Sequence, residues 1–440
     1  MLLPRLSERL LPLLLCAVLA LFCATTAQAA GVSITLTASE YALHYAFDAG
    51  AQDPFVILEY ATPAEKGWMM LYSEDGHFEG DVSLAYSGAG GKTSVALTSA
   101  RTTGSIGKAS TTLPKAADYQ KPTGKSNAKV MDFVLTETPE GFHYAFNAIG
   151  TDYMLLYWRS KEQTVTQPVY EGDVVSELTF ARTQFTVQVK SGSGSMKKEA
   201  TVRKGYQAPE APQRQEGRLS GVTVCIDAGH QENGRFVNEP IGPGLTGSTS
   251  GKGGMAQGTK TNRRESIVCL EIGMLLRDEL LRQGANVVMT REDQTTFHTN
   301  IERCEIAEAG GAQIMLRLHC NNSSNRSKRG IQVYGPLNSD YAKAVADADT
   351  YREMGQKLLD AMKTRVGMTL ANSTGMVRLN DNYVGNNWAK MMCFLVEMGY
   401  LSNPAEEYLL VTPVYQQWLA EGMADGVYEI AVARGWVQAQ

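Results

Sequence analysis

The stretch VTVCIDAGH, residues 222–230, marks a change in the character of the chain. Its first part is a run of β-branched and apolar residues, which predicts a buried strand, and Gly229 predicts a sharp turn directly after it. His230 follows that turn. A histidine at the end of a buried strand is most often a satisfied polar group, so its role depends on which residues the fold places beside it.

Beyond this stretch, the sequence alternates between strand and helix patterns. Strands are expected at residues 222–226, 286–290, 314–318 and 394–396, and helices at residues 300–309, capped by Asn300, and 351–366. Apolar positions from Val268 to Leu280 recur at helical spacing until Gly284, and Asn403 before Pro404 marks another helix start. This alternation predicts an α/β domain with a mainly parallel sheet over residues 219–440.

The first half of the chain carries a weak internal repeat. LHYAF at residues 43–47 recurs as FHYAF at 142–146, and FEGDV at 78–82 recurs as YEGDV at 170–174. Both copies contain short alternating runs separated by turn residues, which is the pattern of half-buried strands. The chain is therefore expected to be multidomain, with two N-terminal all-β sandwich-like repeats. These repeats are placed at residues 30–112 and 128–205, with linkers at 113–127 and 206–218.

Residues 1–29 have the pattern of a secretory signal peptide. Arg5 and Arg9 precede an apolar run at residues 10–22, and Ala27 and Ala29 are small residues suited to cleavage. A membrane anchor would need roughly 20 apolar residues. A lipoprotein signal would need a small residue where Phe22 precedes Cys23. We therefore expect an exported protein.

Composition and charge restrict the class of partner. Apolar residues make up 43% and charged residues 20% of the chain, as in folded globular proteins. The formal net charge of −5 gives no broad basic field, so nucleic acid is not expected as a partner. Basic residues do gather locally between Arg101 and Lys129. This segment is either a solvated linker or a region attracted to an anionic surface.

The cysteines do not predict a disulfide framework. Five remain after the predicted signal peptide, all beyond residue 220, and their odd number and irregular spacing match neither paired disulfides nor a thiolate zinc site. We expect most of them to be small buried residues. The five are Cys225, Cys269, Cys304, Cys320 and Cys393.

Four acid-base or metal-binding side chains are expected at one edge of the predicted sheet. His230, His319 and Glu397 each follow a predicted strand, and Glu265 opens the helix after a glycine-rich loop. Ligands of open α/β sheets bind beyond the carboxyl ends of the strands. Two imidazoles and one carboxylate form a ligand set that zinc uses in hydrolases, and a second carboxylate can transfer protons. Spacing alone does not decide whether Glu265 or Glu397 is the ligand.

Four blocks of sequence together resemble a known enzyme family. They are CIDAGH, RRESIVCLEIGMLLRDELLRQGANVVMTRE, IERCEIAEAGGAQIMLRLHCNN and FLVEMGYLSNPAEE. In this order they are similar to the zinc-dependent N-acetylmuramoyl-L-alanine amidases of the type 3 group, over about residues 219–435. The segments EPIGPG and NNWAK are also similar to those of the family's Gram-positive members.

The resemblance implies a role for each of the four side chains. The family's zinc ligands fall on His230, Glu265 and His319, and its catalytic glutamate falls on Glu397. Cys320 departs from the family pattern, because a small or polar residue usually follows the second histidine. It is expected to be a packing residue, with an auxiliary thiolate ligand or a cysteine nucleophile as alternatives.

The sequence also suggests roles for other polar residues near these blocks. Arg291 and Arg303 are expected to hold the fold rather than to touch substrate, and His298 matches no ligand position. The segment 386–388, Asn-Asn-Trp, is a candidate for the lining of the groove. Residues 337–349 either restrain activity by packing over the groove or begin the helix that follows.

The resemblance implies hydrolysis of the amide between the lactyl group of N-acetylmuramic acid and L-alanine in bacterial peptidoglycan. Such an enzyme serves cell-wall remodelling or lysis, as an autolysin does, and acts outside the cytoplasmic membrane. Two alternatives stay open: a zinc peptidase acting within the stem peptide, and a wall-binding protein that has lost activity. The N-terminal repeats could bind a cell-wall polymer or a protein partner, and the sequence does not indicate the oligomeric state.

Overall fold

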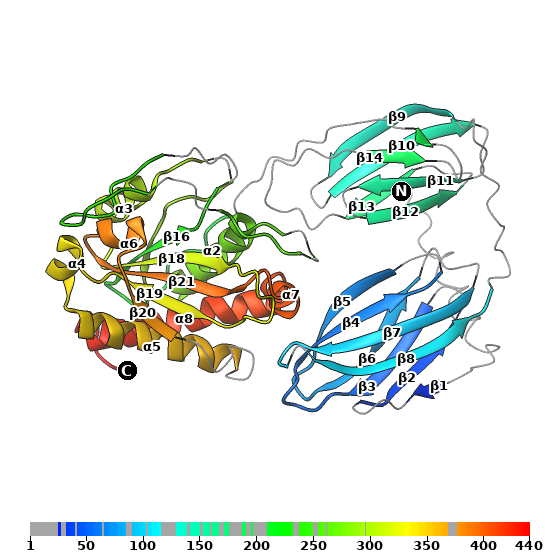
Figure 1. Ribbon diagram of the computed structural model, residues 1–440, viewed down its shortest axis with the longest axis horizontal. Coiled ribbons are helices and arrows are strands. Elements are labelled where there is room, and N and C mark those ends of the chain that lie inside the picture. The colour runs from blue at the N-terminus through cyan, green and yellow to red at the C-terminus, as the bar shows by residue number, and fades with distance from the viewer. Residues whose placement is uncertain are drawn as a thin grey trace, which may run out of the picture. The chain divides into compact units, whose positions relative to one another are not determined.

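The computed structural model describes three parts of the chain, which divide between two compact units, so each part is described by itself (Figure 1). The residues it describes are 25–27, 32–39, 42–63, 66–84, 90–102, 104–115, 129–138, 141–149, 153–158, 161–166, 171–175, 187–190, 195–196, 209–231, 237–249, 254–259, 261, 263–294, 296–367 and 376–440. Most of the predicted signal peptide lies outside them. Its residues Thr25–Ala27 form strand β1.

The first part is a β-sandwich of two antiparallel four-stranded sheets, in the orders β1-β2-β3-β6 and β5-β4-β7-β8. Alternate residues of the strands face inward, as the period-2 pattern predicts. Leu36 and Phe47 of one sheet meet Leu58 and Leu97 of the other in a single buried core. The strands are β2 Ile34–Ala38, β3 Ala42–Asp48, β4 Phe55–Ala61, β5 Lys66–Tyr72, β6 His77–Ser83, β7 Gly91–Ser99 and β8 Ser105–Leu113.

The second part contains a three-stranded sheet, β13-β10-β9, and a four-stranded sheet, β12-β11-β14-β15. In the first part, His44 pairs with Asp81 across β3 and β6, and in the second part His143 pairs with Asp173 across β10 and β13. The similar pentapeptides therefore pair in the same register in both parts. The strands are β9 Lys129–Thr138, β10 Gly141–Ile149, β11 Tyr153–Trp158, β12 Lys161–Thr166, β13 Glu171–Val175, β14 Val187–Lys190 and β15 Ser195–Met196.

The third part is the predicted α/β domain, built on a six-stranded sheet in the order β17-β16-β18-β21-β19-β20. Strands β17, β16, β18 and β21 are parallel, whereas β19 pairs antiparallel with β21, and β20 pairs parallel with β19. The strands are β16 Thr223–Ala228, β17 Asn286–Met289, β18 Ile314–Asn321, β19 Gln332–Gly335, β20 Met376–Leu379 and β21 Met392–Tyr400. The prediction of a mainly parallel sheet is confirmed.

Helices cover both faces of this sheet (Figure 1). On one face, α2 packs against β16 and β18, and α8 packs against α2 and α5. On the other face, α3 packs against β17, and α6 packs against α3 and β21. The helices are α2 Glu265–Arg282, α3 Asn300–Ala309, α4 Asp340–Val345, α5 Ala348–Val366, α6 Val384–Trp388, α7 Pro404–Leu410 and α8 Pro413–Ala433.

Helix starts follow the local sequence, with one correction. Asn403 caps α7 by accepting bonds from the first-turn backbone, and Pro404 is the first helical residue, as predicted. The cap of α3 is Thr299 rather than Asn300, because Thr299 and Glu302 form a reciprocal capping box. Residues 337–349 form the short helix α4 and the first turn of α5.

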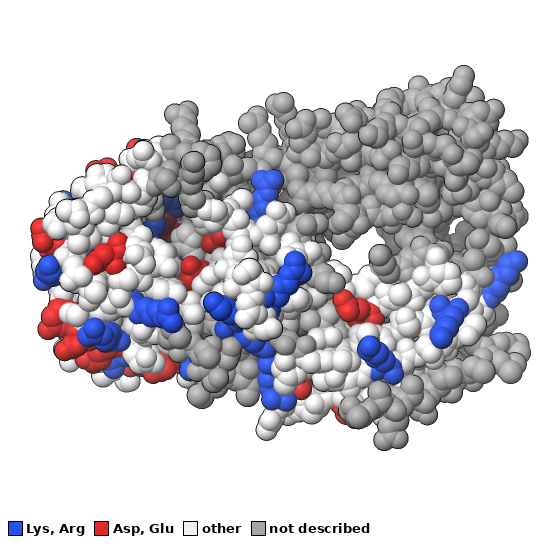
Figure 2. All heavy atoms as spheres, in the orientation of Figure 1, with Lys and Arg blue, Asp and Glu red and all other residues white. Residues whose placement is uncertain are grey.

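All five cysteines of residues 209–440 are buried and unpaired, as the sequence predicts. Cys225, Cys304 and Cys393 share one cluster between the sheet and α3. Acidic and basic side chains lie interspersed on the face of this domain that Figure 2 shows. Within the described part of the chain, no helix has both the length and the apolar character needed to cross a membrane.

Candidate metal centre and active site

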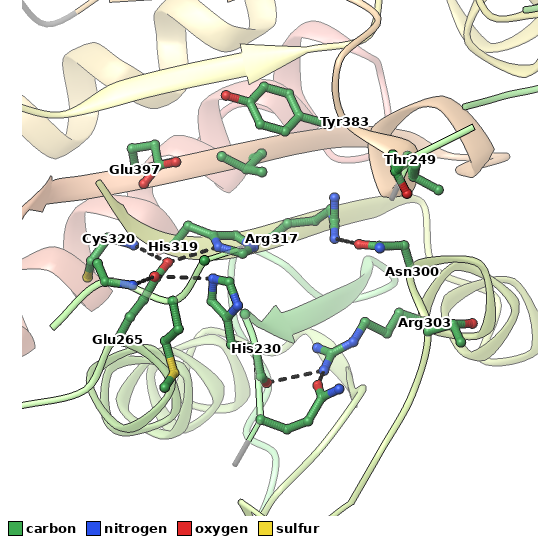
Figure 3. A pocket seen from close by; sticks show the side chains of 18 of the residues that line it. His230, Thr249, Glu265, Asn300, Arg303, Arg317, His319, Cys320, Tyr383 and Glu397 are labelled. Atoms are coloured by element: carbon green, nitrogen blue, oxygen red, sulfur yellow. Dashed lines mark hydrogen bonds and ion pairs between the residues drawn. The ribbon is translucent and has the colours of Figure 1, made fainter. Parts of the chain in front are cut away.

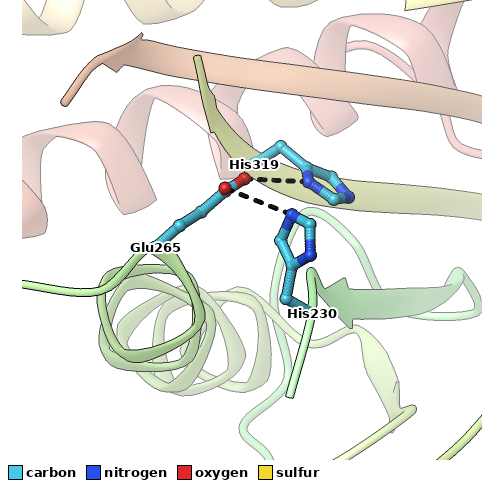
Figure 4. Close-up of side chains that lie close together, drawn as sticks. All are labelled: His230, Glu265 and His319. Atoms are coloured by element: carbon cyan, nitrogen blue, oxygen red, sulfur yellow. Dashed lines mark hydrogen bonds and ion pairs between the residues drawn. The ribbon is translucent and has the colours of Figure 1, made fainter. Parts of the chain in front are cut away.

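Three of the predicted site residues come together at one edge of the sheet (Figure 4). Nε2 of His230 lies 3.1 Å from Oε2 of Glu265, and Nδ1 of His319 lies 3.0 Å from Oε1 of the same carboxylate. One donor atom from each residue lies within 4.8 Å of the other two. A carboxylate flanked by two imidazoles is therefore preformed here, and it could hold a metal ion.

Each of the three residues is delivered by a different element. His230 follows β16, His319 lies near the end of β18, and Glu265 is the first residue of α2. β16 and β18 are parallel neighbours, so their carboxyl ends lie at the same edge. Glu265 opens α2 at the same edge, where its backbone N–H donates to the carbonyl oxygen of Ala256 at 2.9 Å.

The turn after β16 is strained at one residue and crowded at another. His230 has a φ of 57°, and it is the only non-glycine residue with positive φ among the described residues. A Cβ atom on Gly229 would lie 2.6 Å from Cε1 and 2.7 Å from Nε2 of His319. The absence of a side chain at Gly229 therefore lets the two imidazoles approach each other, with ring centroids 4.9 Å apart.

Hydrogen bonds fix the Glu265 carboxylate in its ionised form. Besides the two imidazoles, it accepts bonds from the backbone N–H groups of Ala256 at 2.7 Å and Cys320 at 3.0 Å. Burial alone would raise the pKa of Glu265, but the contacts with His230 and His319 lower this pKa below its ordinary value. Burial also lowers the pKa of His319, which favours the neutral imidazole that binds metals.

Glu397 stands across from His319 on the neighbouring strand, because β18 and β21 pair these two residues in register. It lines the same pocket, and its Oε2 atom is buried without a hydrogen-bond partner among the described residues. Burial, together with the charge of Glu265, raises the pKa of Glu397 to about 8. The structure thus separates the two glutamates: the pKa of Glu265 is lowered between two histidines, whereas the pKa of Glu397 is raised.

Two buried arginines hold the backbone that carries His230. Arg291 donates to the carbonyl oxygens of Ala228 at 2.7 Å, of Gly229 at 2.8 Å and of Ser266 at 2.8 Å. Arg303 donates to the carbonyl oxygens of Ala228 and His230. Arg291 thus ties the turn before His230 to the start of α2, which carries Glu265. Both arginines thus make the backbone bonds that the sequence predicts, and Arg303 also lines the pocket.

The site residues line a pocket of about 980 Å³ (Figure 3). His298 belongs to its lining, and its backbone carbonyl accepts bonds from Gln231 and Arg303. Asp227, Arg317 and Tyr383 were not singled out from the sequence, although Asp227 belongs to the quoted CIDAGH block. Arg317 and Tyr383 line the pocket, and Asp227 is buried beside Arg317.

The prediction that residues 386–388 line the groove is wrong. Asn386 and Asn387 are fully buried, and their side chains donate to the backbone carbonyls of Tyr334, Ile241 and Asp381. The indole N–H of Trp388 likewise donates to the backbone carbonyl oxygen of Pro240 at 2.8 Å. These side chains therefore bind backbone carbonyl groups and do not line the pocket.

With the geometry established, comparison with known proteins gives the family of this part. Residues 224–429 match the Amidase_3 family, described as N-acetylmuramoyl-L-alanine amidase. This part of the chain is an Amidase_3 domain. The match contains all four predicted site residues.

Relatives of the Amidase_3 domain have similar names. The chain is 26% identical over 231 residues to the germination-specific N-acetylmuramoyl-L-alanine amidase of Bacillus subtilis, covering 49% of this chain and 83% of that protein. It is 27% identical over 218 residues to the probable cell wall amidase LytH of Staphylococcus aureus, covering 49% of this chain and 60% of that protein.

Solved structures match the same half of the chain. One is an N-acetylmuramoyl-L-alanine amidase from Clostridium difficile 630, with 24% identity, a TM-score of 0.38 and coverage of 48% of this chain and 96% of that one. Another is the CwlD amidase of Clostridioides difficile in complex with the GerS lipoprotein, with 19% identity, a TM-score of 0.36 and coverage of 48% and 99%.

Proposed function

We propose that this protein is a zinc-dependent N-acetylmuramoyl-L-alanine amidase that hydrolyses the amide between the lactyl group of N-acetylmuramic acid and L-alanine in peptidoglycan. The observation that supports this most is the group of His230, Glu265 and His319 beside a proton-exchanging Glu397, inside an Amidase_3 domain. Three protein ligands that leave a position open to the pocket are the arrangement of catalytic rather than structural zinc sites.

The residues present fit a single zinc ion. His230 and His319 would be the nitrogen ligands and Glu265 the oxygen ligand, and the hydrogen bonds from the backbone of Ala256 and Cys320 would hold the carboxylate in place. A zinc ion bound there would supply Lewis acidity toward the scissile carbonyl group and lower the pKa of a water molecule.

Glu397 is the proposed catalytic residue. Its raised pKa allows it to take a proton from the attacking water and to give it to the leaving amine nitrogen of L-alanine, so that the bond between carbonyl carbon and nitrogen is broken and a carboxylate and an amine are formed. Oε2 of Glu397 has no hydrogen-bond partner among the described residues, so no other protein group there competes for the proton on this carboxyl group.

The alternatives predict different products. A zinc peptidase acting within the stem peptide would use the same ligand set but would leave L-alanine attached to the sugar. A wall-binding protein without activity would need to have lost a ligand or the proton-transfer group, and this chain retains all four. The Amidase_3 match favours the amidase.

The N-terminal half is proposed to locate the enzyme outside the cell. We expect residues 1–29 to be removed on export, and we propose that the two β-rich parts are repeats, because their similar pentapeptides pair in the same register. They would bind a cell-wall polymer or a protein partner and so bring the domain to its insoluble substrate.

Metal removal tests the proposed cofactor. We expect the purified protein to contain one zinc ion per chain, to lose release of peptide from peptidoglycan on treatment with a chelator, and to regain it when zinc is added back. His319→Ala should bind no zinc at the concentration that saturates the wild type, as measured by elemental analysis after dialysis. Full activity in the metal-free protein would contradict the zinc proposal.

A further inference from the structure

Arg317 has no part in the chemistry described above, although it lies on the same strand and the same face as His319. Side chains two residues apart on a strand point in the same direction, and two residues cover about 6.6 Å. Arg317 is only 5% exposed, and it lines the pocket between His319 and Asn300 (Figure 3). A buried guanidinium on a pocket wall needs a reason, since burial of a charge costs free energy.

The charges around Arg317 do not balance. Asp227 is shared by Arg317 and Arg303: it accepts from Nε of Arg317 at 2.9 Å and from Nη1 of Arg303. Glu239, another buried acid that lines the pocket, accepts hydrogen bonds from the side chain and backbone of Asn300 and not from a guanidinium. One carboxylate therefore serves two guanidinium groups, while the other carboxylates that line the pocket, Glu239, Glu265 and Glu397, form no ion pair with Arg317.

The two arginines differ in how many of their donors are used. Arg303 donates to Asp227, Gln231 and the carbonyl oxygens of residues 228, 230 and 298, so all of its nitrogens are engaged. Arg317 donates from Nε to Asp227 and from Nη2 to Asn300 at 2.7 Å. Among the described residues, no hydrogen bond to Nη1 of Arg317 is formed. Figure 3 shows the Arg317 side chain at the pocket wall, with its bond to Asn300.

The backbone of α6 leaves room for this guanidinium. A Cβ atom on Gly385 would lie 2.6 Å from Nε of Arg317, and closer still to Cζ and Nη1. Gly385 thus allows the guanidinium plane to rest against the first turn of α6, while Asp227 and Asn300 fix two of its three nitrogens. A guanidinium held in this way presents its remaining N–H groups in a fixed direction, which suits recognition of a carboxylate.

We infer that Arg317 binds a carboxylate on the second residue of the stem peptide and thereby selects substrates that carry a free acid there. This inference rests on the proposed function, because it assumes that L-alanine is the first residue past the metal. An extended peptide would place a carboxyl group on the second residue about 7 Å from the scissile carbonyl carbon. That length matches the two-residue step along β18 from His319 to Arg317.

Two matched substrates test this assignment without any change to the protein. They are N-acetylmuramoyl-L-alanyl-γ-D-glutamyl-L-lysine and N-acetylmuramoyl-L-alanyl-D-isoglutaminyl-L-lysine. In both, the γ-carboxyl group of the second residue forms the peptide bond to lysine, so the two differ only in an acid or an amide at the α-carbon of that residue. Because hydrogen bonds between charged groups are strong, we expect kcat/KM to be about 10- to 100-fold higher for the acid. Equal values for the two substrates, or a preference for the amide, would overturn the assignment.

Substitution of Arg317 tests whether this residue causes the preference for the acid. Arg317→Gln should lower kcat/KM for the acid and bring the ratio of the two substrates close to one, while Arg365→Gln, at an exposed ion pair with Glu421, should leave the ratio unchanged. A purely structural role for Arg317 would lower both values equally and preserve the ratio, which would contradict the inference. If neither substrate is cut, the proposed function fails. The role of Arg317 is then decided by the dissociation constants of the two substrates: tighter binding of the acid supports it, and equal binding contradicts it.

Discussion

Glu397→Gln should abolish most of the activity and leave the metal site intact. The substitution keeps the shape of the side chain but removes the proton acceptor that faces the pocket across from His319. Since general acid-base groups contribute about 100- to 10,000-fold, kcat/KM for peptide release should fall by that factor. Zinc content should stay at the wild-type level, because Glu397 is not part of the His230, Glu265 and His319 group.

The control for this substitution is a carboxylate of the same domain that lies away from the pocket. Glu353 is exposed on α5, and Glu353→Gln should leave both kcat/KM and zinc content unchanged. The comparison is made with both variants at the same zinc saturation. Loss of zinc together with loss of activity in Glu397→Gln would mean that the two glutamates exchange roles, with Glu397 as a ligand.

Gly229→Ala should destroy the metal site through crowding alone. The added methyl group would lie 2.6 Å from Cε1 of His319 and 2.5 Å from the carbonyl oxygen of Leu318, so that either the ring or the strand must move. Outer groups that orient zinc ligands already change affinity by 10- to 100-fold, and displacement of a ligand ring should cost at least about 100-fold. The measurement is zinc affinity by competition with a chelator of known affinity.

Substitution of a second glycine in the same pocket is the control, because it removes a glycine without crowding any neighbour. Gly254 lines the pocket, and a Cβ atom there would meet no atom within 4 Å. Gly254→Ala should therefore bind zinc as the wild type does. Wild-type zinc affinity in Gly229→Ala, with a folded domain by circular dichroism, would show that His319 is not held where the structure places it.

The convergence of the site residues could be predicted from the sequence because parallel strands end at one edge. His230 and His319 each follow an apolar run, and the structure places both at the carboxyl ends of adjacent strands. Spacing could not separate Glu265 from Glu397, because both reach that edge. The two glutamates differ in their surroundings. Two imidazoles and two backbone N–H groups bind the carboxylate of Glu265, whereas Oε2 of Glu397 has no hydrogen-bond partner among the described residues.

Other features could not be predicted because they depend on side-chain direction. Asn386 and Asn387 stand beside the pocket in sequence, but they turn inward to bond backbone carbonyls. Arg317 is buried in an apolar strand, and only the shared Asp227 and the open face of Gly385 reveal why a charge is placed there. Strands β19 and β20 are four residues each, which is too short for period-2 patterning to predict them.

The central claim is the identity of the bond that is cut, and mass spectrometry of the products tests it most directly. Purified peptidoglycan is digested with the zinc-loaded protein, and the newly formed amino groups are labelled before hydrolysis. The proposed activity predicts stem peptides that begin with a free L-alanine amino group, together with glycan strands whose lactyl groups end in carboxylates. Released peptides that lack L-alanine, with that residue still attached to the sugar of the glycan strand, would contradict it. They would identify a peptidase instead.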